Sequence, residues 1–358
     1  MELYEYARPD VMAGKKILYV HGFASSGQSG TVRTMRTLLP NAEVIAPDLP
    51  VRPQEAMLLL HAICQEQKPD LIIGTSMGGM YAEQLHGFRR ILVNPAFTLA
   101  DTILKNNGLG RQEFHSPRTD GQTSFLVNKG LIEDFREVSS LCFDGMQPTS
   151  TLASSLGDKE GDKANVFGMF GRQDNLVHTM PLFASYYPNV ISFEGGHYLD
   201  DSVFLHSVLP IISRIDDMIQ GRSKPVVFIT LGDTIMDLKG GEAHSLSLND
   251  MQPINGAAKA FADLSRHYRP FVLIAADYNR PDEIPVMWEW IEKHLGTPAW
   301  ERITVCGDKS MIIGDYLVDA HPNRLGSQDF LGTVIHFGEE PFKTWDEVSE
   351  YFGRLGGQ

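Results

Sequence analysis

The sequence predicts an α/β protein with two successive domains, and three observations carry this prediction. Short apolar runs alternate with segments of helical periodicity, which is typical of a mostly parallel sheet covered by helices on both faces. A Gly/Pro-containing linker at 221–225 is followed by a new apolar run, and the alternation starts again. The chain of 358 residues is longer than one ordinary domain. We therefore expect domains at 1–220 and 221–358.

The first domain is expected to hold six strands and an inserted lid. The predicted strands are 16–20, 43–46, 71–73, 90–93, 165–170 and 190–193, and the predicted helices include 31–39, 53–67 and 203–220. The segment at about 98–162 is polar and rich in Gly, Asn, Asp and Ser, with a short helical piece near 128–138. We interpret it as a lid over a pocket. The alternative is a disordered insertion.

A serine motif ends the third predicted strand. Gly74-Thr75-Ser76-Met77-Gly78 has the Gly-x-Ser-x-Gly spacing, with an apolar run before it and a helix-compatible run after it. The glycines allow the strand and the helix to approach closely around the turn. This context predicts a nucleophile elbow with Ser76 as the nucleophile. The alternative is a strand–turn–helix with an incidental serine.

Two later residues complete a candidate catalytic triad. Asp174 and His197 also follow predicted strands of the same sheet, and the order serine, acid, histidine is that of the α/β-hydrolase arrangement. A serine hydroxyl needs a base to remove its proton, so His197 is the candidate base and Asp174 the residue that orients it. A helix-capping role for Asp174 and a role of His178 in place of His197 are the alternatives. For the oxyanion hole we expect the backbone N–H groups of Met77 and Phe23.

The residues of the first domain are similar to those of a known family. The segment from 16 to about 215 resembles small bacterial α/β-hydrolase-like esterases of the YqiA/UPF0227 type. The matching stretches are Tyr19-Val20-His21-Gly22-Phe23, Ser25-Ser26, Gly74-Thr75-Ser76-Met77-Gly78-Gly79, Leu92-Val93-Asn94-Pro95-Ala96, Asp174 and Gly195-Gly196-His197. The resemblance implies hydrolysis of a small acyl ester or thioester, with neither a metal nor an organic cofactor.

The second domain has its own α/β pattern and its own resemblance. Expected strands are 226–229, 271–275, 302–306, 316–318 and 333–336, and expected helices are 256–267, 285–295 and 345–355. The domain resembles haloacid-dehalogenase-like (HAD) phosphatases, in particular the cytosolic-type 5′(3′)-deoxyribonucleotidases, which implies a smaller Rossmann-like fold. The matching stretches are Met251-Gln252-Pro253-Ile254-Asn255-Gly256-Ala257, Asp308-Lys309-Ser310, Gly314-Asp315-Tyr316-Leu317-Val318-Asp319 and Ile335-His336-Phe337-Gly338.

The departures from that family fall on its catalytic positions. Thr230 stands where the resemblance implies a nucleophilic Asp, Gly232 where it implies the acid/base Asp, and Ile274 where it implies a phosphate-binding Ser or Thr. The fourth motif reads Asp319-Ala320 in place of paired acids, and Lys309 alone is retained. Loss of carboxylates argues against Mg²⁺ binding and phosphoryl transfer. We expect a catalytically inactive domain of structural or regulatory role. A one-residue slip that brings Asp233 to the metal position, and a Lys309 that is only a surface lysine, are the alternatives.

Composition narrows the function classes. The net charge of −14 argues against nucleic-acid and anionic-membrane partners. Cys64, Cys142 and Cys306 form no CxxC pair and no even disulfide framework, and the N-terminus lacks the pattern of a secretory signal, so we expect a cytoplasmic protein. A homo-oligomer is left open.

The sequence therefore predicts a serine hydrolase of the esterase or thioesterase type fused to a pseudo-phosphatase domain. Two other classes are the alternatives. One is a non-catalytic binding protein, and the other is a nucleotide phosphatase that acts through the second domain.

Overall fold

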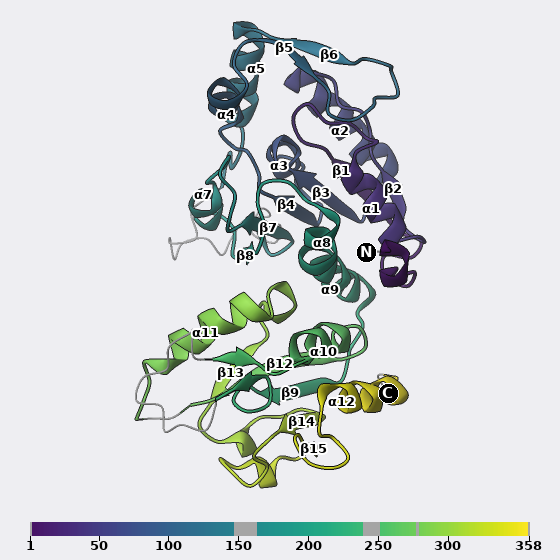
Figure 1. Ribbon diagram of the computed structural model, residues 1–358. Coiled ribbons are helices and arrows are strands. Elements are labelled where there is room, and N and C mark those ends of the chain that lie inside the picture. Colours follow the sequence, from purple (N-terminus) through teal and green to yellow (C-terminus); the bar gives the residue numbers. More distant parts are fainter. Residues whose placement is uncertain (1, 147–162, 239–250, 277–278, 357–358) are drawn as a thin grey trace. The chain divides into compact units, whose positions relative to one another are not determined.

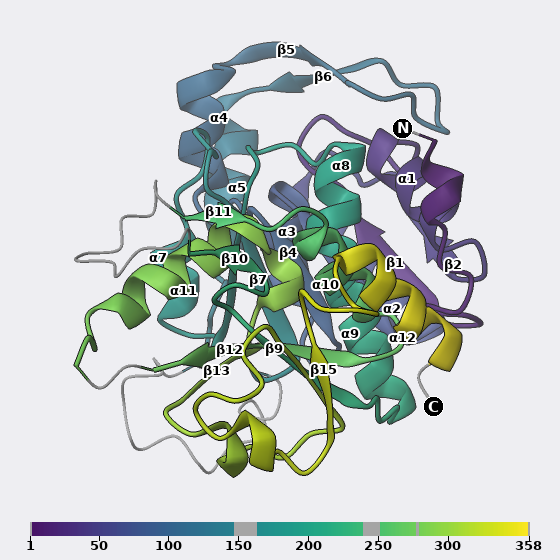
Figure 2. The same ribbon diagram turned by 60° about the horizontal axis from the view of Figure 1, so that its bottom comes forward.

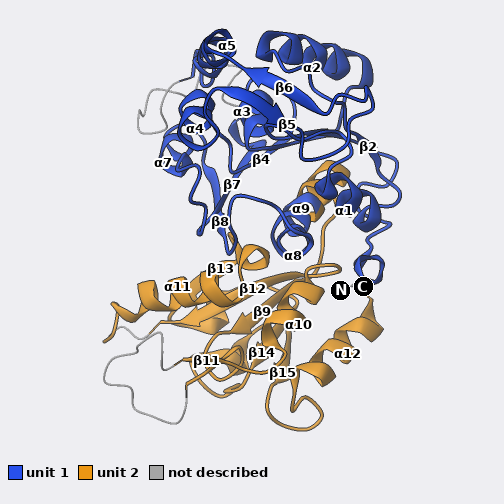
Figure 3. Ribbon diagram, turned by 45° about the horizontal axis from the view of Figure 1, so that its top comes forward, with its two compact units in different colours: residues 1–212 blue, residues 213–358 orange. Residues whose placement is uncertain are grey.

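The computed structural model describes residues 2–146, 163–238, 251–276 and 279–356. The chain divides into two compact units, Met1–Ile212 and Ser213–Gln358 (Figure 3). The division falls inside helix α9 (Leu209–Gln220), ahead of the linker at 221–225. The last turns of α9 therefore belong to the second unit.

The first unit is built on a parallel sheet. Its described strands follow the order β2-β1-β3-β4-β7-β8 (Figure 1), and every neighbouring pair is parallel. The bounds are β1 Lys16–Val20, β2 Glu43–Ile45, β3 Leu71–Thr75, β4 Arg90–Val93, β7 Val166–Gly171 and β8 Asn189–Phe193. The predicted mostly parallel sheet is confirmed. Its carboxyl edge gathers the loops that carry the site, as expected of such sheets.

Helices cover this sheet because the strands are apolar on both faces. α1 spans Gly30–Leu38, α2 Pro53–Gln67, α3 Met77–Glu83 and α7 Met180–Ala184. α2 begins with Pro53, whose fixed φ and missing N–H suit a first helical position. Alternate strand residues, among them Leu18, Ile72 and Leu92, are fully buried in one core cluster with Leu60 of α2.

The segment predicted as a lid contains regular structure. α4 (Leu99–Asn106), the antiparallel hairpin of β5 (Gly110–Glu113) and β6 (Ser124–Val127), and α5 (Lys129–Ser139) gather at one end of the unit (Figures 1 and 2). The alternative of a disordered insertion is wrong for 99–139, because α5 buries Leu131, Ile132, Phe135 and Val138 in the core. Residues 147–162 of the expected lid lie outside the described residues.

The helix predicted over 203–220 is interrupted. α8 (Asp201–Val203) leads into a π-helical turn at Phe204–Val208, and α9 follows. Pro210 has no N–H to donate to the preceding turn, so the regular α-helical ladder fails at this place.

The second unit is a smaller parallel sheet of the HAD type. Its described strands follow the order β13-β12-β9-β14-β15, all parallel. The bounds are β9 Val226–Thr230, β12 Arg269–Ala275, β13 Ile303–Cys306, β14 Tyr316–Asp319 and β15 Thr333–His336, with helices α10 Ala257–Leu264, α11 Glu283–His294 and α12 Trp345–Leu355. A two-stranded ladder of β10 (Met236–Asp237) and β11 (Gln252–Pro253) was not predicted, because two-residue strands have no periodicity. Trp290 and Trp345 are fully buried in the main core.

Candidate active site

Ser76 occupies a strained turn between β3 and α3. Its φ of 54° and ψ of −116° lie outside the regions that L-residues prefer. The turn is held from both sides: the Ser76 N–H donates to the Val93 carbonyl at 2.9 Å, and the Ser76 carbonyl accepts from the N–H groups of Gly79 and Ala96, each at 3.0 Å. Strain that is maintained by surrounding hydrogen bonds is typical of a functional position.

The glycines around Ser76 leave no room for a side chain. A Cβ at Gly78 would lie 1.9 Å from the Val20 carbonyl oxygen, and one at Gly74 would lie 2.3 Å from the Gly78 oxygen. A Cβ at Gly79 would lie 2.8 Å from Cβ of Pro95. The strand and the helix approach each other closely at these glycines. This is the reason that we expected for the Gly-x-Ser-x-Gly spacing.

Ser76, His197 and Asp174 form a continuous chain of hydrogen bonds. His197 Nε2 lies 2.9 Å from Ser76 Oγ, and His197 Nδ1 lies 2.8 Å from Asp174 Oδ2. The loops after β3, β7 and β8 bring them together at the carboxyl edge of the sheet. Because a carboxylate accepts only, Nδ1 carries the proton, which leaves Nε2 as the acceptor for the serine hydroxyl. His178 is exposed, and Thr179, not Asp174, stands at the start of α7.

Asp174 is held in its charged form. Burial raises the pKa of its carboxyl group, but hydrogen bonds from His197 and from the N–H groups of Leu176 and Val177 outweigh burial, and the net pKa is below the ordinary value. An ionised Asp174 at neutral pH stabilises a positive charge on His197.

The loop after β1 lies against the serine. A Cβ at Gly22 would be 3.4 Å from Cβ of Ser76, so only a glycine leaves the space between them open. Among the hydrogen bonds of the described residues, the backbone N–H groups of Phe23 and Met77 have no acceptor. Both donors are available for an anion beside Ser76.

His21 fixes the shape of this loop. Its Nδ1 lies 2.8 Å from the Gly22 carbonyl and its Nε2 accepts from the Leu49 N–H at 3.1 Å. Burial lowers the pKa of His21 to about 4, so the ring is neutral and keeps one tautomer at physiological pH. His21 is a structural residue of the loop rather than a second base.

The insertion is tied to the same loop. The His115 N–H donates to the Ala24 carbonyl at 2.7 Å, and the Ser26 hydroxyl donates to the Pro117 carbonyl at 2.7 Å. One oxygen of Asp48 accepts from the Gly27 N–H and the other from the Thr119 N–H. Hydrogen bonds therefore connect the turn of the β5–β6 hairpin to the loop after β1, which contains Phe23.

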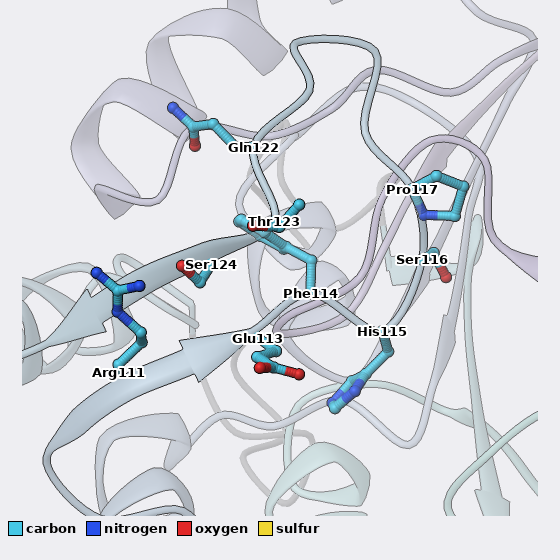
Figure 4. Close-up of a pocket in the computed structure, with 9 residues that line it drawn as sticks. All are labelled: Arg111, Glu113, Phe114, His115, Ser116, Pro117, Gln122, Thr123 and Ser124. Atoms are coloured by element: carbon cyan, nitrogen blue, oxygen red, sulfur yellow. The ribbon is translucent and has the colours of Figure 1, made fainter.

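The hairpin also forms a hollow of about 360 Å³ (Figure 4). Arg111, Glu113, Phe114 and His115 belong to its lining, and Ser76, Asp174 and His197 do not. The Phe114 ring packs against Phe125, which packs edge-on against Phe23. Aromatic contacts thus run from the hairpin to the loop beside the serine.

Asn94, which lies in a stretch similar to the esterase family, joins the loops of the site although its sequence context predicts no role for it. Its side-chain amide donates to the carbonyls of Gly196 at 3.0 Å and His197 at 3.1 Å, and its side-chain oxygen accepts from the Gly171 N–H at 2.8 Å. Asn94 is buried and has a φ of 44°. The signal that the sequence carries is the position of Asn94 directly after a predicted strand, in a stretch that matches the esterase family; the structure adds a left-handed conformation that asparagine tolerates.

In the second unit, the residues at the phosphatase-like positions form a buried network. Thr230 Oγ1 lies 2.9 Å from Asp319 Oδ1, and Lys309 Nζ lies 2.6 Å from Asp319 Oδ2. The Ser327 hydroxyl and the His321 N–H also donate to Asp319. The interpretation of Lys309 as a surface lysine is wrong: the residue is 2% exposed because its ammonium group is paired with a buried carboxylate.

The donor set of this network does not fit Mg²⁺. Each oxygen of Asp319 already accepts two protein hydrogen bonds, and Thr230 is a neutral, weak ligand. Asp233 pairs with His321 at 2.9 Å and accepts from the Leu238 N–H. Within the described residues, no three His, Cys, Asp or Glu side chains are grouped so as to hold a metal.

The two remaining phosphatase-like positions are also filled by apolar structure. Ile274 is buried in the main core of the second unit. A Cβ at Gly232 would lie 2.8 Å from the Leu238 side chain, which occupies the space of an acid at this position.

The strand order, the elbow and the Ser–His–Asp chain define the first unit as an α/β-hydrolase fold. Comparison with protein families confirms both resemblances. Residues 16–131 match the model of an uncharacterised protein family, UPF0227, and residues 244–347 match the 5′ nucleotidase, deoxy (pyrimidine), cytosolic type C family. The first match ends within α5, before Asp174 and His197.

Relatives of this chain carry the name of a putative 5′(3′)-deoxyribonucleotidase. A protein of Vibrio phage KVP40 is 27% identical in an alignment of 164 residues that covers 41% of this chain and 95% of that protein. For a relative from Bordetella pertussis the values are 28% identity over 21% of this chain and 41% of that protein. One from Staphylococcus aureus is 27% identical over 27% of this chain and 57% of its own length.

Solved structures give weaker similarities. Est1E from Butyrivibrio proteoclasticus covers 59% of this chain and 89% of its own, with 12% identity and a TM-score of 0.37. A soluble variant of monoglyceride lipase from Saccharomyces cerevisiae covers 60% and 88%, with 14% identity and a TM-score of 0.37. The fold assignment rests on the topology and the elbow. No helix of the described residues has the length and apolar character that crossing a membrane requires.

Proposed function

We propose that the protein is a serine hydrolase that cleaves a small acyl ester or thioester at Ser76. The observation that carries the proposal is the unbroken chain from Asp174 through His197 to Ser76, with distances of 2.8 and 2.9 Å. A binding protein has no need of a strained serine joined to a buried acid–base pair. The geometry therefore favours catalysis over the non-catalytic alternative.

In the proposed mechanism, Ser76 Oγ attacks the substrate carbonyl and its proton passes to His197 Nε2. The resulting oxyanion accepts hydrogen bonds from the N–H groups of Phe23 and Met77, each of which is worth about 3 kcal/mol in comparable sites. His197 then gives the proton to the leaving alcohol or thiol, and an acyl-serine forms. A water molecule, deprotonated by His197, attacks the acyl-serine and releases the acid and free Ser76. These steps need no metal or organic cofactor.

Labelling with a fluorophosphonate probe tests this proposal. We expect the wild-type chain to be labelled, and Ser76→Ala to be folded and unlabelled. Thr75→Ser, next to the nucleophile, is the matched control and keeps labelling. A folded wild-type chain that is neither labelled nor able to hydrolyse p-nitrophenyl acetate or an acyl-thioester would overturn it.

For the second unit we propose a domain without phosphatase turnover. Saturation of Asp319 by protein donors and the neutral Thr230 support this role. The nucleotidase alternative is favoured by the family match over 244–347. Phosphate release from deoxynucleoside monophosphates with and without Mg²⁺ decides between them: Mg²⁺-dependent release that Asp319→Asn abolishes would establish the alternative.

A further inference from the structure

The second unit carries a cluster of arginines at the amino edge of its sheet, opposite to the phosphatase-like residues. Arg269 begins β12, and Arg302 directly precedes β13. In the parallel register Val272 pairs with Ile303, so Phe271 lies beside Arg302 on the neighbouring strand. Arg269 and Phe271 are two residues apart and share one face of the sheet. The three side chains therefore converge on that face.

Both guanidinium groups lie against one ring. Cζ of Arg269 is 5.2 Å and Cζ of Arg302 is 5.1 Å from the centroid of Phe271. The ring in turn packs with a small apolar cluster that includes Phe228. Cation–π contacts of this kind orient the guanidinium planes without using their N–H donors.

The acids nearby are already engaged. Glu301 pairs with Arg214 at 2.6 Å, and Arg214 stacks on Trp300. Asp217 pairs with Arg222 and Lys224, and Asp216 pairs with Arg222. Among the described residues, the side chains of Arg269 and Arg302 have neither an ion pair nor a hydrogen bond. The positive charges of Arg269 and Arg302 are therefore not paired within the described part of the chain, although the net charge of the chain is −14.

Of these arginines, Arg302 is the one whose positive charge its surroundings disfavour most. Its side chain is partly buried, and burial, followed by the neighbouring charges of Arg214 and Arg269, lowers its pKa to about 10, while the carboxylates of Asp217 and Glu301 act in the opposite direction and are outweighed. Gathering guanidinium groups in excess of the nearby carboxylates costs free energy, which an anion at the same place would recover. Guanidinium forks match phosphate oxygens in geometry, and a dianion neutralises both charges where a carboxylate neutralises one.

We propose that Arg269 and Arg302, oriented by Phe271, form a binding site for the phosphate group of a small molecule. The site belongs to the second unit and lies at the edge of the sheet opposite to the Asp319 network, and it does not depend on hydrolase activity. Free phosphate and a phosphorylated metabolite share the chemistry that the site recognises.

Isothermal titration of the full-length chain with inorganic phosphate and with pyrophosphate, in a low-salt buffer free of phosphate, tests the site. We expect one-to-one binding that weakens with added NaCl. Arg302→Gln and Arg269→Gln each lower the affinity about tenfold or more. Arg302→Lys keeps the charge but loses the fork, so it also weakens binding. Arg354→Gln, which removes an exposed arginine from α12, is the control for net charge and leaves the affinity unchanged.

Three results would overturn the proposal. They are the absence of binding to folded wild-type protein, binding that survives in the double variant Arg269→Gln/Arg302→Gln, and binding that acetate matches in affinity. Arg324 is exposed in the connection after β14, on the side of the carboxyl edge of the sheet. A loss of binding in Arg324→Gln alone would place the anion at that opposite edge and would also contradict the proposal. Stronger binding of pyrophosphate than of phosphate indicates a phosphorylated metabolite rather than free phosphate as the natural ligand.

Discussion

The side-chain amide of Asn94 donates to the backbone carbonyl of His197 at 3.1 Å, while the side-chain oxygen of the same residue accepts from Gly171 on the strand that leads to Asp174. One buried side chain therefore joins the loop of the base to the strand of the acid. The two loops come from different strands, and their relative position decides whether His197 can reach both Ser76 and Asp174. Asn94 is a positioning residue in the proposed mechanism.

We expect Asn94→Asp to lower kcat by roughly 10- to 100-fold with little change in KM, because a carboxylate cannot donate to the Gly196 and His197 carbonyls. Steady-state kinetics on an activated ester measures this split. Thr179→Val is the control, since it removes a buried hydrogen bond to the Pro95 carbonyl and, among the hydrogen bonds of the described residues, none from the Thr179 side chain to a triad residue. It should lower the free energy of unfolding by about 1 kcal/mol and leave kcat unchanged. Equal effects of the two variants on kcat would contradict the positioning role.

Asp174→Asn should retain the fold and lose about four orders of magnitude in kcat. An amide can donate to His197 Nδ1, which favours the tautomer with the proton on Nε2 and removes the acceptor for the serine proton. The initial rate of fluorophosphonate labelling reports the loss without a need for the natural substrate. His178→Asn, a change on the same loop to an exposed residue, should label at the wild-type rate. Unchanged labelling of Asp174→Asn would rule Asp174 out as the triad acid.

Gly78→Ala should prevent stable folding of the first unit. The new Cβ would lie 1.9 Å from the Val20 oxygen and 2.7 Å from the His21 oxygen, and both are backbone atoms of the neighbouring strand and loop. Gly30→Ala in α1 is the matched change, because its Cβ would meet nothing closer than a flexible arginine end at 3.8 Å. Thermal unfolding should show a large fall in Tm or insoluble protein for the first variant and a neutral or stabilising effect for the second. A Gly78→Ala protein with wild-type Tm would disprove the steric argument.

The first unit should lose stability as the pH falls from about 6.5 to about 4, in part through His21. In this window the unfolded chain binds a proton at His21 and the folded chain does not, because burial lowers the folded pKa to about 4. Stability therefore rises with pH across the window, and the contribution reaches about 3 kcal/mol. Denaturant unfolding of the wild type and of His21→Gln at about pH 7 and about pH 5 measures it. The wild type should lose more free energy of unfolding than the variant, and parallel losses would be inconsistent with a neutral buried His21.

Lys309→Met should destabilise the second unit by roughly 3 kcal/mol, because it leaves the Asp319 carboxylate buried without its cation. Lys259→Met breaks an exposed pair with Asp263 and should cost less than about 1 kcal/mol. Chemical unfolding followed by tryptophan fluorescence suits both variants, since Trp290 and Trp345 are buried in this unit. Indistinguishable midpoints for the two variants would mean that the Asp319 network does not stabilise the unit.

Much of this architecture was predictable from local patterns. Each strand of the two parallel sheets is a short apolar run, and strands that are buried on both faces are apolar along their whole length, so their positions are visible in the sequence. The elbow was predictable because its glycines and its strand–turn–helix context are contiguous. Prediction failed for three elements whose formation depends on particular hydrogen bonds rather than on apolar periodicity. They are the π-helical turn before Pro210, the two-residue strands β10 and β11, and the ordered hairpin of mostly polar residues at 110–127.

The sequence by itself determined the order of the strands along the chain, the nucleophile turn and the loss of acids at Thr230 and Gly232. Only the tertiary structure decided which residues meet. Asn94 reaches Gly171 and His197, Asp48 joins Gly27 to Thr119, and Lys309 is buried against Asp319. Arg269 and Arg302 converge on Phe271 only because the parallel register places β12 beside β13. The physical reason is that periodicity records which face of an element is buried, whereas a polar contact depends on the register between strands that lie far apart in the chain.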